Sequence, residues 1–468
     1  MCKHKIILSI LVLQVIFSCS KSINTSGLQQ ALPDNYRGTS TDSVSIGDIP
    51  WKTFFPDQKL NALIDEAIVN NNDLKVALKN IERAQLTFKQ SKLGNIPALD
   101  IVAGGSSTRL SDNSLNGFTT NKFLGAHHID DYNVAARLSW EADIWGKISS
   151  RKSSALAQYL QTEEARKAVQ TQIVSSVAKA YYNLLMLDTQ LRIAKENATL
   201  NNNTFSMITL QFESGKATSL AVQQAKAQEL EALQLVPRFE QEIIIQENAI
   251  SILTGKLPEA VQRTSDLDHL TITENISAGI PSSLLARRPD LKRAELDIVR
   301  ANAEIGFAKA NMYPSLIITA QGGANTFKFS NWFNIPASLF GTLAGGLTQP
   351  IFQRKTLKTQ YEIAKVSRAQ SVVEFRQAVL VAVGEVSNAL ISIEKLNSQT
   401  EKYSERSLTL RQATDNAQSL FQNGFADYLE VITAQGKVLQ SELELASIKK
   451  EKLDAMVDLY RSVGGGWQ

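Results

Sequence analysis

The stretch YNVAARLSWEADIW at residues 132–145 alternates between apolar and polar side chains along its length. Its apolar side chains occupy the even positions: Tyr132, Val134, Ala136, Leu138, Trp140, Ala142 and Ile144. Successive side chains of a β-strand point to opposite faces, so this period of two predicts a strand with one apolar and one polar face. A lipid-facing barrel strand needs about nine to eleven such residues, and soluble sandwich strands rarely hold the pattern so long.

Three further segments have strand patterns. Residues 98–107 are predicted to pair with residues 132–145 through a polar loop. A weaker second hairpin is predicted over residues 316–321 and 339–349. Four aromatic residues lie in the loop of this second hairpin: Phe327, Phe329, Trp332 and Phe333. They predict either a girdle at the membrane interface or a local hydrophobic cluster.

The chain also repeats itself. NDLK at residues 72–75 is echoed by PDLK at residues 289–292, an offset of 217 positions. FESG at residues 212–215 is echoed by FQNG at residues 421–424, an offset of 209 positions. Two similar halves, each a long helix, short strands and a very long helix, are more typical of a wall element in a larger assembly than of an enzyme with one cleft.

Helix-breaking residues disappear after each predicted hairpin. Residues 147–214 contain neither Gly nor Pro, and no proline follows Pro350. A continuous helix over the first of these stretches would reach on the order of 100 Å. Gly215 and Gly424 are predicted to end such helices at turns between antiparallel rods. A narrow coiled-coil stripe is predicted in the last helix, at Phe425, Leu429, Ile432, Gly436, Leu439, Leu443 and Ala446.

The first 18 residues have the pattern of a secretory signal, with lysines before an apolar run that ends at Phe17. The run is followed by Ser18 and Cys19, which resembles a bacterial lipobox, in which Cys19 is lipidated and becomes the mature N-terminus. Ordinary signal cleavage with an incidental cysteine is the alternative. Cys2 would leave with the signal, so no internal disulfide is predicted. No later segment is long and apolar enough for a transmembrane helix, so insertion into a membrane would require strands.

Composition excludes several classes of function. A formal net charge of +3, from 49 basic and 46 acidic residues, does not favour nucleic acid as a partner. The chain has four histidines and two cysteines, and His127-His128 falls in a predicted surface loop, so no metal site is predicted. Nucleophile-elbow, phosphate-loop and metalloprotease motifs are all missing, which argues against catalysis and against any cofactor other than a lipid on Cys19.

Four amphipathic strands are too few to close a barrel, because the smallest bacterial outer-membrane barrels have about eight. An open sheet edge in lipid would leave backbone groups unsatisfied, at a cost of several kcal/mol each. Each copy of the chain is therefore predicted to supply one sector of an oligomeric barrel.

Three separated motifs resemble one known family. GIPSSLLARRPDL at residues 279–291 is similar to the signature of TolC-like outer-membrane efflux proteins, in particular the NodT-type lipoproteins that work with resistance-nodulation-division (RND) pumps. WEADIWGK at residues 140–147 and QPIF at residues 349–352 resemble the strand-to-helix motifs of the family's two halves. The resemblance covers nearly the whole mature chain.

The resemblance implies a mixed α and β membrane protein, a homotrimer whose twelve-stranded barrel continues into a periplasmic α-helical barrel. It implies an outer-membrane exit duct, lipid-anchored and passive, that works with an inner-membrane RND transporter and a periplasmic membrane-fusion adaptor. The expected domains are a signal peptide (1–18), a tether (19–50), a first repeat (51–256), an equatorial connection (257–283) and a second repeat (284–468). An equatorial belt is expected from the connection, the N-terminal region and the C-terminal end.

By the same resemblance, the helical tips contact the adaptor through Gly215, Lys216, Ala217, Gly424, Phe425 and Ala426. The alternative for the glycines is that they only permit a tight turn. Asp427 and Glu430, at i and i+3, are candidates for an acidic ring at the periplasmic aperture or for an ordinary solvated face. The first half has Ala221 in place of Glu430, so the two tips are not equivalent.

Two other groups of residues have expected roles. Arg137, Glu141 and Asp143 are predicted to face the barrel lumen and set its polarity. Arg287, Arg288, Pro289 and Asp290 form the family motif, and their predicted role is structural, because Pro and Asp suit a first helical turn and arginines pair with acidic partners. Two other functions fit the same sequence, namely the duct of a type I protein-secretion system and a lipid-anchored coiled-coil scaffold without a pore.

Overall fold

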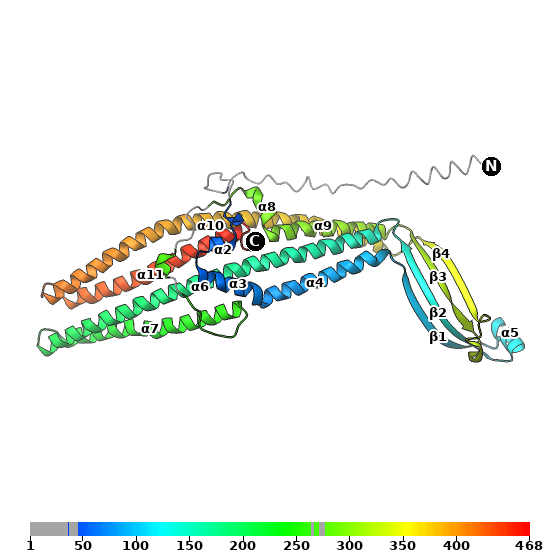
Figure 1. The fold of residues 1–468 in the computed structure, drawn as a ribbon, viewed down its shortest axis with the longest axis horizontal. Coiled ribbons are helices and arrows are strands. Elements are labelled where there is room, and N and C mark those ends of the chain that lie inside the picture. The colour runs from blue at the N-terminus through cyan, green and yellow to red at the C-terminus, as the bar shows by residue number, and fades with distance from the viewer. Residues whose placement is uncertain (1–35, 37–44, 264–265, 271–276) are drawn as a thin grey trace.

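The computed structural model describes residues 36, 45–263, 266–270 and 277–468. A long body of helices ends in a four-stranded sheet at one end (Figure 1). The predicted mixture of long helices and a small sheet is confirmed. The predicted signal, Cys19 and most of the tether lie outside the described residues.

The sheet is antiparallel, with its strands in the order β1-β2-β3-β4. The strands are β1 (Ala98–Arg109), β2 (His128–Ala142), β3 (Ser315–Thr326) and β4 (Leu339–Thr348). Both predicted hairpins are confirmed, although β2 begins earlier than predicted and ends at Ala142, three residues before Trp145. The two outer strands, β1 and β4, each leave one edge unpaired within the described residues.

The loop between β1 and β2 contains a helix, α5 (Leu115–Leu124), where only a polar loop was predicted. The hydroxyl of Ser114 accepts a hydrogen bond from the amide of Gly117 at its start, and Gly125 ends it in the left-handed conformation. Its apolar side chains, including Leu115, Phe118 and Phe123, lie exposed and form no single stripe. Without such a stripe, the sequence of this segment shows no helical periodicity.

Two pairs of long antiparallel helices form most of the body. In the first pair α6 (Lys147–Glu213) is followed by α7 (Ser219–Leu253), and in the second α10 (Thr356–Gln422) is followed by α11 (Tyr428–Ser462). The bounds of α10 and α11 are those of α6 and α7 shifted by 209 positions. Each 67-residue helix spans about 100 Å, the length predicted from the absence of helix breakers.

Two shorter helices widen the body near the sheet. They are α4 (Asn72–Lys92) and α9 (Pro289–Ala310), and α4, α6, α9 and α10 lie side by side in that order (Figure 1). Towards the other end the order is α7, α6, α11, α10. The edges of this single curved layer are therefore α4 and α7 on one side and α10 on the other.

Small elements fill the middle of the body: α2 (Trp51–Phe54), α3 (Gln58–Asn70), α8 (Leu284–Arg287) and the 3-10 turns η1 (Ile46–Asp48), η3 (Leu267–His269) and η4 (Pro281–Ser283). Two further 3-10 turns lie outside the middle, η2 (Leu93–Asn95) after α4 and, in the β3–β4 loop, η5 (Phe329–Asn331). Residues 51–70 form two helices, α2 and α3, with a break between them. The break lies at Pro56-Asp57, where the Asp57 carboxylate caps α3 by accepting from the amides of Lys59 and Leu60.

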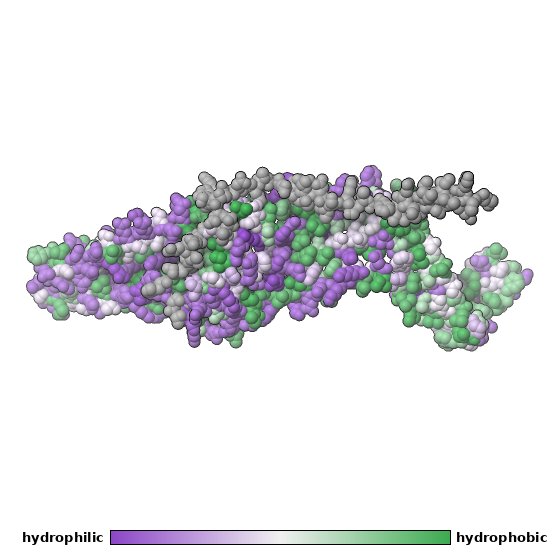
Figure 2. All heavy atoms as spheres, turned by 45° about the horizontal axis from the view of Figure 1, so that its top comes forward, coloured by the Kyte–Doolittle hydropathy of each residue, from purple (hydrophilic) through white to green (hydrophobic). Residues whose placement is uncertain are grey.

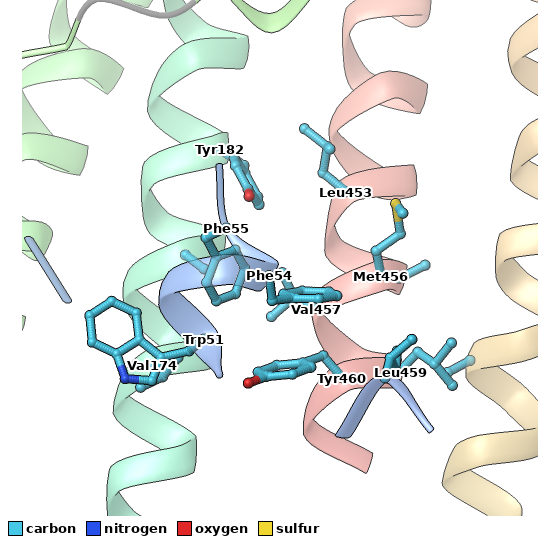
Figure 3. Close-up of a cluster of buried hydrophobic side chains, with 14 of the residues drawn as sticks. Trp51, Phe54, Phe55, Val174, Tyr182, Leu453, Met456, Val457, Leu459 and Tyr460 are labelled. Carbon is cyan, nitrogen blue, oxygen red and sulfur yellow. The ribbon is translucent and has the colours of Figure 1, made fainter. Parts of the chain in front are cut away.

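The largest hydrophobic core lies where the N-terminal segment meets the end of the chain. Phe54 stacks on Tyr460 with ring centroids 4.1 Å apart, and Figure 3 shows Trp51, Phe55 and Val457 gathered around them. The hydroxyl of Tyr460 donates to the carbonyl of Ile49 at 2.6 Å. Segments more than 400 positions apart thus close one core.

The coiled-coil stripe predicted over residues 425–446 is confirmed in part. Leu439 and Ala446 are buried, whereas Phe425 and Leu429, close to the tip, are exposed. Within one chain α11 packs between α6 and α10, and its buried surface also includes Val431, Gln435 and Val438 beside the predicted stripe. Spacing alone predicts the period of a seam but not which neighbour it meets.

Candidate functional site

The polar face of the sheet carries the residues predicted to line a lumen. Arg137 pairs directly across from Asp100 on β1 and from Gln321 on β3, so these three side chains share one face. Leu138, one position on, pairs with Leu99 and Ala320 on the opposite face. Figure 2 shows hydrophobic residues dominating the visible side of the sheet.

Glu141 and Asp143 serve the junction between β2 and α6. Glu141 lies on the same sheet face as Arg137, and its carboxylate accepts from Nζ of Lys147 at 2.9 Å. Asp143 lies beyond the last residue of β2, and its two oxygens accept from the amides of Ile148 and Ser149, each at 2.9 Å. A carboxylate at a helix N-terminus accepts hydrogen bonds from free amides and interacts favourably with the positive end of the helix dipole. Asp143 therefore caps α6 and does not continue the alternation of β2.

Two tryptophans fix the sheet to the helices, and sequence reasoning gave neither a role. Trp140 Nε1 donates to the carbonyl of Asn95 at 2.9 Å, and Trp145 Nε1 donates to that of Pro314 at 2.8 Å. Trp145 also stacks on Tyr313. The sequence signal for this role was the presence of two tryptophans, whose indole N–H groups donate hydrogen bonds, where the apolar strand meets polar residues.

The Arg-Arg-Pro-Asp motif begins α9. Pro289 is the first helical residue, and Asp290 lies in the first turn. Arg288 holds Asp290 through both carboxylate oxygens, at 3.0 and 2.6 Å. Its Nη1 also donates to Glu385 Oε2 at 2.8 Å and to the carbonyl of Ser462 at 3.1 Å. One guanidinium therefore ties α9 to α10 and to the end of α11.

The Arg288 side chain is only 7% exposed, and its charge is balanced by two carboxylates. Burial acts to raise the pKa of Asp290, but the hydrogen bonds and charge of Arg288 outweigh it and hold that pKa below its ordinary value. Burial likewise opposes the charge of Arg288, and Asp290 with Glu385 raises its pKa on balance. Both groups are ionised at neutral pH.

Arg287 joins the two ends of the chain. Its Nη2 donates to Asp48 Oδ2 at 2.6 Å, and its backbone carbonyl accepts from Trp467 Nε1 at 3.3 Å. A Cβ on Gly464, whose φ is +92°, would lie 2.8 Å from that same carbonyl oxygen. The C-terminal glycine turn therefore lets the chain end lie against α8.

The segments expected to form an equatorial belt meet in this region. Ser45 bridges Ala278, and the amide of Ile46 donates to the carbonyl of Ser277 at 2.9 Å. Arg263, in the connection between the halves, contacts Asp188 of α6 and Glu247 of α7. The N-terminal segment, the connection and the C-terminal end are thus in contact at the middle of the body.

The two hairpin tips are built alike. Gly215 has a φ of +70° and Gly424 a φ of +78°, and each follows the last turn of a long helix. The amide of Phe425 donates to the carbonyl of Leu420 at 2.9 Å, closing the second turn. The Phe425 side chain is 82% exposed. Lys216 is exposed, and Ala217 and Ala426 are half-buried.

The acidic pair at the second tip is exposed. Asp427 is the N-cap of α11, where its carboxylate accepts from the amide of Tyr428, and Glu430 lies in the first turn. Neither carboxylate forms an ion pair within the described part of the chain. At the first tip Thr218 is the cap, and Ala221, in the position of Glu430, is fully buried.

A contact between the two tips was missed by sequence reasoning. Tyr428 Oη donates to Gln224 Oε1 at 2.7 Å, and deeper in the body Gln435 Nε2 donates to Thr204 Oγ1 at 2.8 Å. Ile208, Ala221 and Phe421 pack together beside them. The two hairpins are therefore joined close to their ends.

Both edges of the structure expose apolar residues. On α4 these are Val76, Leu78 and Leu86, and Leu93 follows directly in η2. On α10 they are Ile363, Val366, Val373, Leu380 and Val381. The buried residues of α10, such as Ala382 and Val386, lie on its other side. An exposed apolar row on a helix indicates a surface that another element covers.

No helix in the described ranges is both long enough and apolar enough to cross a bilayer. Among the same residues there is no group of three or more His, Cys, Asp or Glu side chains placed to hold a metal ion. His127 instead contacts Asp112, Nδ1 to Oδ1, at 2.8 Å in the loop beyond the sheet.

Comparison with known proteins agrees with this architecture. The family model for outer membrane efflux proteins matches residues 63–256 and 280–465. A crystal structure of CusC superposes with a TM-score of 0.80 at 27% sequence identity, covering 93% of this chain and 100% of that one.

Three curated relatives match over most of their length. The cation efflux system protein CusC of Escherichia coli K12 is 29% identical over 449 residues, which are 95% of this chain and 92% of the relative. The solvent efflux pump outer membrane protein SrpC of Pseudomonas putida is 29% identical over 418 residues, 89% and 87%. The probable outer membrane lipoprotein SilC of Salmonella typhimurium is 26% identical over 429 residues, 90% and 89%.

Proposed function

The chain belongs to the outer membrane efflux protein family, and on that premise we propose that three copies of it form a passive duct for small molecules. The protein is an outer-membrane efflux channel of a tripartite pump and extends into the periplasm. In the proposed trimer three four-stranded sheets close a twelve-stranded barrel, and three helical layers continue it below the membrane.

The two free sheet edges carry the proposal. An unpaired strand in lipid leaves amides and carbonyls without partners, at several kcal/mol each. Pairing β4 of one copy with β1 of the next satisfies both edges and leaves the apolar face outward. Closed rotational symmetry then removes every edge without a second kind of subunit.

The helical layer supports the same arrangement. Its edges, α4 and α10, lie directly below the strand edges β1 and β4, and both expose apolar residues. The α4 helix runs towards the sheet and α10 runs away from it, so neighbouring copies would pack these helices antiparallel. Val76 and Leu86 on α4 would then meet Val366 and Val373 on α10.

The partners in this proposal are a periplasmic membrane-fusion adaptor and an inner-membrane RND transporter. The adaptor would contact the hairpin tips, where Phe425 presents a large apolar side chain on a rigid turn. Asp427 and Glu430 would repeat three times around the aperture. The duct itself would supply no energy and no catalysis.

A lipid on Cys19 is proposed as the outer-membrane anchor. The support is the Ser18-Cys19 pair at the end of the apolar run, together with the word lipoprotein in the name of the relative SilC. Relatives of equal identity are named for cations and for solvents. We therefore assign selection of the small molecule to the transporter.

Disrupting either helical edge tests the duct. Val373→Glu and Leu86→Glu would place charges in the proposed interface, so we expect loss of the trimer by native mass spectrometry and loss of conductance in planar bilayers. Lys152→Glu, an exposed change on α6 in the interior of the helical layer, is the control and should leave both unchanged. Wild-type protein that is monomeric and gives no channels would overturn the proposal.

A further inference from the structure

One row of side chains crosses the whole polar face of the sheet. Asp100 on β1 pairs with Arg137 on β2, which pairs with Gln321 on β3, which pairs with Thr342 on β4. Directly opposed residues of antiparallel strands point to the same face, with Cβ atoms about 4.5–5.5 Å apart. Each protomer therefore holds one acidic and one basic side chain at the same level of its wall.

The rows on either side of this level carry no charge. Towards the loops lie Val102, Ala135, Gly323 and Phe340, and towards the helices lie Ala98, Ser139, Thr319 and Ala344. Most of these side chains are small. Asp100 and Arg137 are therefore the only charged side chains over three consecutive levels of the described sheet.

The other charged side chains on this face, Glu141 and Asp131, are already engaged. Glu141 binds Lys147, and Asp131 Oδ1 accepts from Asn325 Nδ2 at 2.6 Å. Asp100 and Arg137 are both exposed, and neither forms an ion pair within 4.0 Å in the part of the chain that the structure describes. Their charges are therefore exposed on the polar face of the sheet.

We propose that Asp100 and Arg137 form a charge-balanced belt that keeps the barrel open to solutes of either sign. The proposal rests on the trimeric duct proposed above. Three copies place three carboxylates and three guanidinium groups on one ring, with a net charge of zero. Rings of like charge make pores selective for the opposite ion, and a ring of alternating sign does not.

Removing either partner uncovers the other. Asp100→Asn leaves three positive charges on the ring and favours anions, whereas Arg137→Gln leaves three negative charges and favours cations. Screening shortens the reach of these charges to about 10 Å at 0.1 M salt and about 30 Å at 0.01 M, so the shift should grow as salt is lowered.

The experiment measures the ratio of potassium to chloride permeability from reversal potentials in planar bilayers, with the full-length trimer. We expect each single variant to change this ratio by about twofold or more, in opposite directions, because wall charges create potentials of several kT. The double variant Asp100→Asn with Arg137→Gln should return to the wild-type ratio. Asp65→Asn, on α3 in the helical body, is the charge-matched control.

A cysteine variant allows the charge at position 137 to be changed after the protein has folded, so an effect of the substitution on folding does not confuse the test. The sequence has only two cysteines: Cys2 would be removed with the signal, and Cys19 would carry the lipid. Arg137→Cys would therefore provide the one free thiol. A methanethiosulfonate reagent with a quaternary ammonium group forms a disulfide with it and restores the positive charge after folding. We expect that reagent to return the permeability ratio to the wild-type value and a sulfonate-bearing reagent to favour cations further.

The outcomes separate the belt from the duct. Channels whose permeability ratio is unchanged in both single variants and after thiol labelling would overturn the belt and leave the duct intact. Absence of any wild-type conductance would overturn the duct. Shifts of opposite sign that cancel in the double variant would establish the belt.

Discussion

Arg288 Nη1 lies 2.8 Å from Glu385 Oε2, which joins the residue preceding α9 to the middle of α10, 97 positions further along the chain. Glu385 in turn faces Arg461 of α11 at 3.9 Å, and Asp458 of α11 binds Lys179 of α6 at 2.7 Å. The ion pairs thus reach from α9 across the helical layer to α6.

Removing Arg288 should destabilise the protein strongly. Arg288→Ala leaves Asp290 and Glu385 without their shared partner, and breaking a buried ion pair costs about 3–5 kcal/mol. The more exposed Arg287, at 22%, pairs with a half-exposed Asp48, so Arg287→Ala should cost about 1 kcal/mol. Thermal unfolding in detergent compares the two, and equal losses would contradict the assignment.

Asp290 should make stability depend on acid pH. Its pKa is lower in the folded protein than the ordinary 3.8, because Arg288 stabilises the carboxylate against the effect of burial. The stabilisation is therefore fully present above pH 3.8 and is lost as the pH falls through the folded pKa. Asp290→Asn should flatten the decline of unfolding temperature between neutral and acid pH. Glu295→Gln, an exposed carboxylate on the same helix, is the control.

The tip glycines should respond to substitution in the opposite way from a glycine inside a helix. Gly424→Ala forces a side chain into φ +78° and should cost about 1–2 kcal/mol, although no atom blocks the new Cβ. Gly384 lies inside α10 with equally open space, so Gly384→Ala should stabilise by about 0.5–1 kcal/mol. Chemical unfolding midpoints give the two signs, and a neutral Gly424→Ala would show that the turn is not fixed.

The exposed phenylalanine at the second tip should matter for partner binding and not for folding. Phe425→Ser removes a side chain that is 82% exposed, so unfolding should change by less than about 0.5 kcal/mol. Crosslinking to a periplasmic adaptor in cells should fall severalfold. Phe352→Ser, 87% exposed beyond the end of β4, is the matched control and should crosslink normally. Unchanged crosslinking at both sites would place the adaptor contact elsewhere.

The length of the tether should limit where Tyr36 can dock. Burial raises the pKa of Tyr36 to about 12 against the opposing charges of Arg288 and Arg287, so Tyr36 lies beside the start of α9. The 22-residue α9 separates that point from β3 by about 33 Å. A lipid on Cys19 leaves roughly 17 residues, which reach about 56 Å fully extended.

Deleting residues 25–34 would leave a reach of roughly 24 Å, too short to hold both the lipid and Tyr36. We expect Tyr36 to leave the core, with a loss of about 2 kcal/mol in the stability of the trimer. Replacing the same ten residues by a Gly-Ser linker of equal length should have no effect. Equal stability of the deletion and the linker variant would argue against an anchored Cys19.

Local patterns in the sequence determined much of the fold. The alternation over residues 132–145 predicted β2, and the absence of Gly and Pro predicted α6, because side-chain period and helix breakers act over a few neighbouring residues. The incomplete sheet followed from the number of amphipathic strands. Helix α5, which was not predicted, has no apolar stripe and is set by its caps.

Only the tertiary structure decided which charged residues meet. Arg288 finds Glu385 and the Ser462 carbonyl at 97 and 174 positions away, and Arg137 finds Asp100 through strand register. Asp143, predicted to line a lumen with Arg137, is turned to the first amides of α6 because β2 ends one residue earlier. Such pairings depend on how helices pack and where strands stop, and no local period in the chain carries that information.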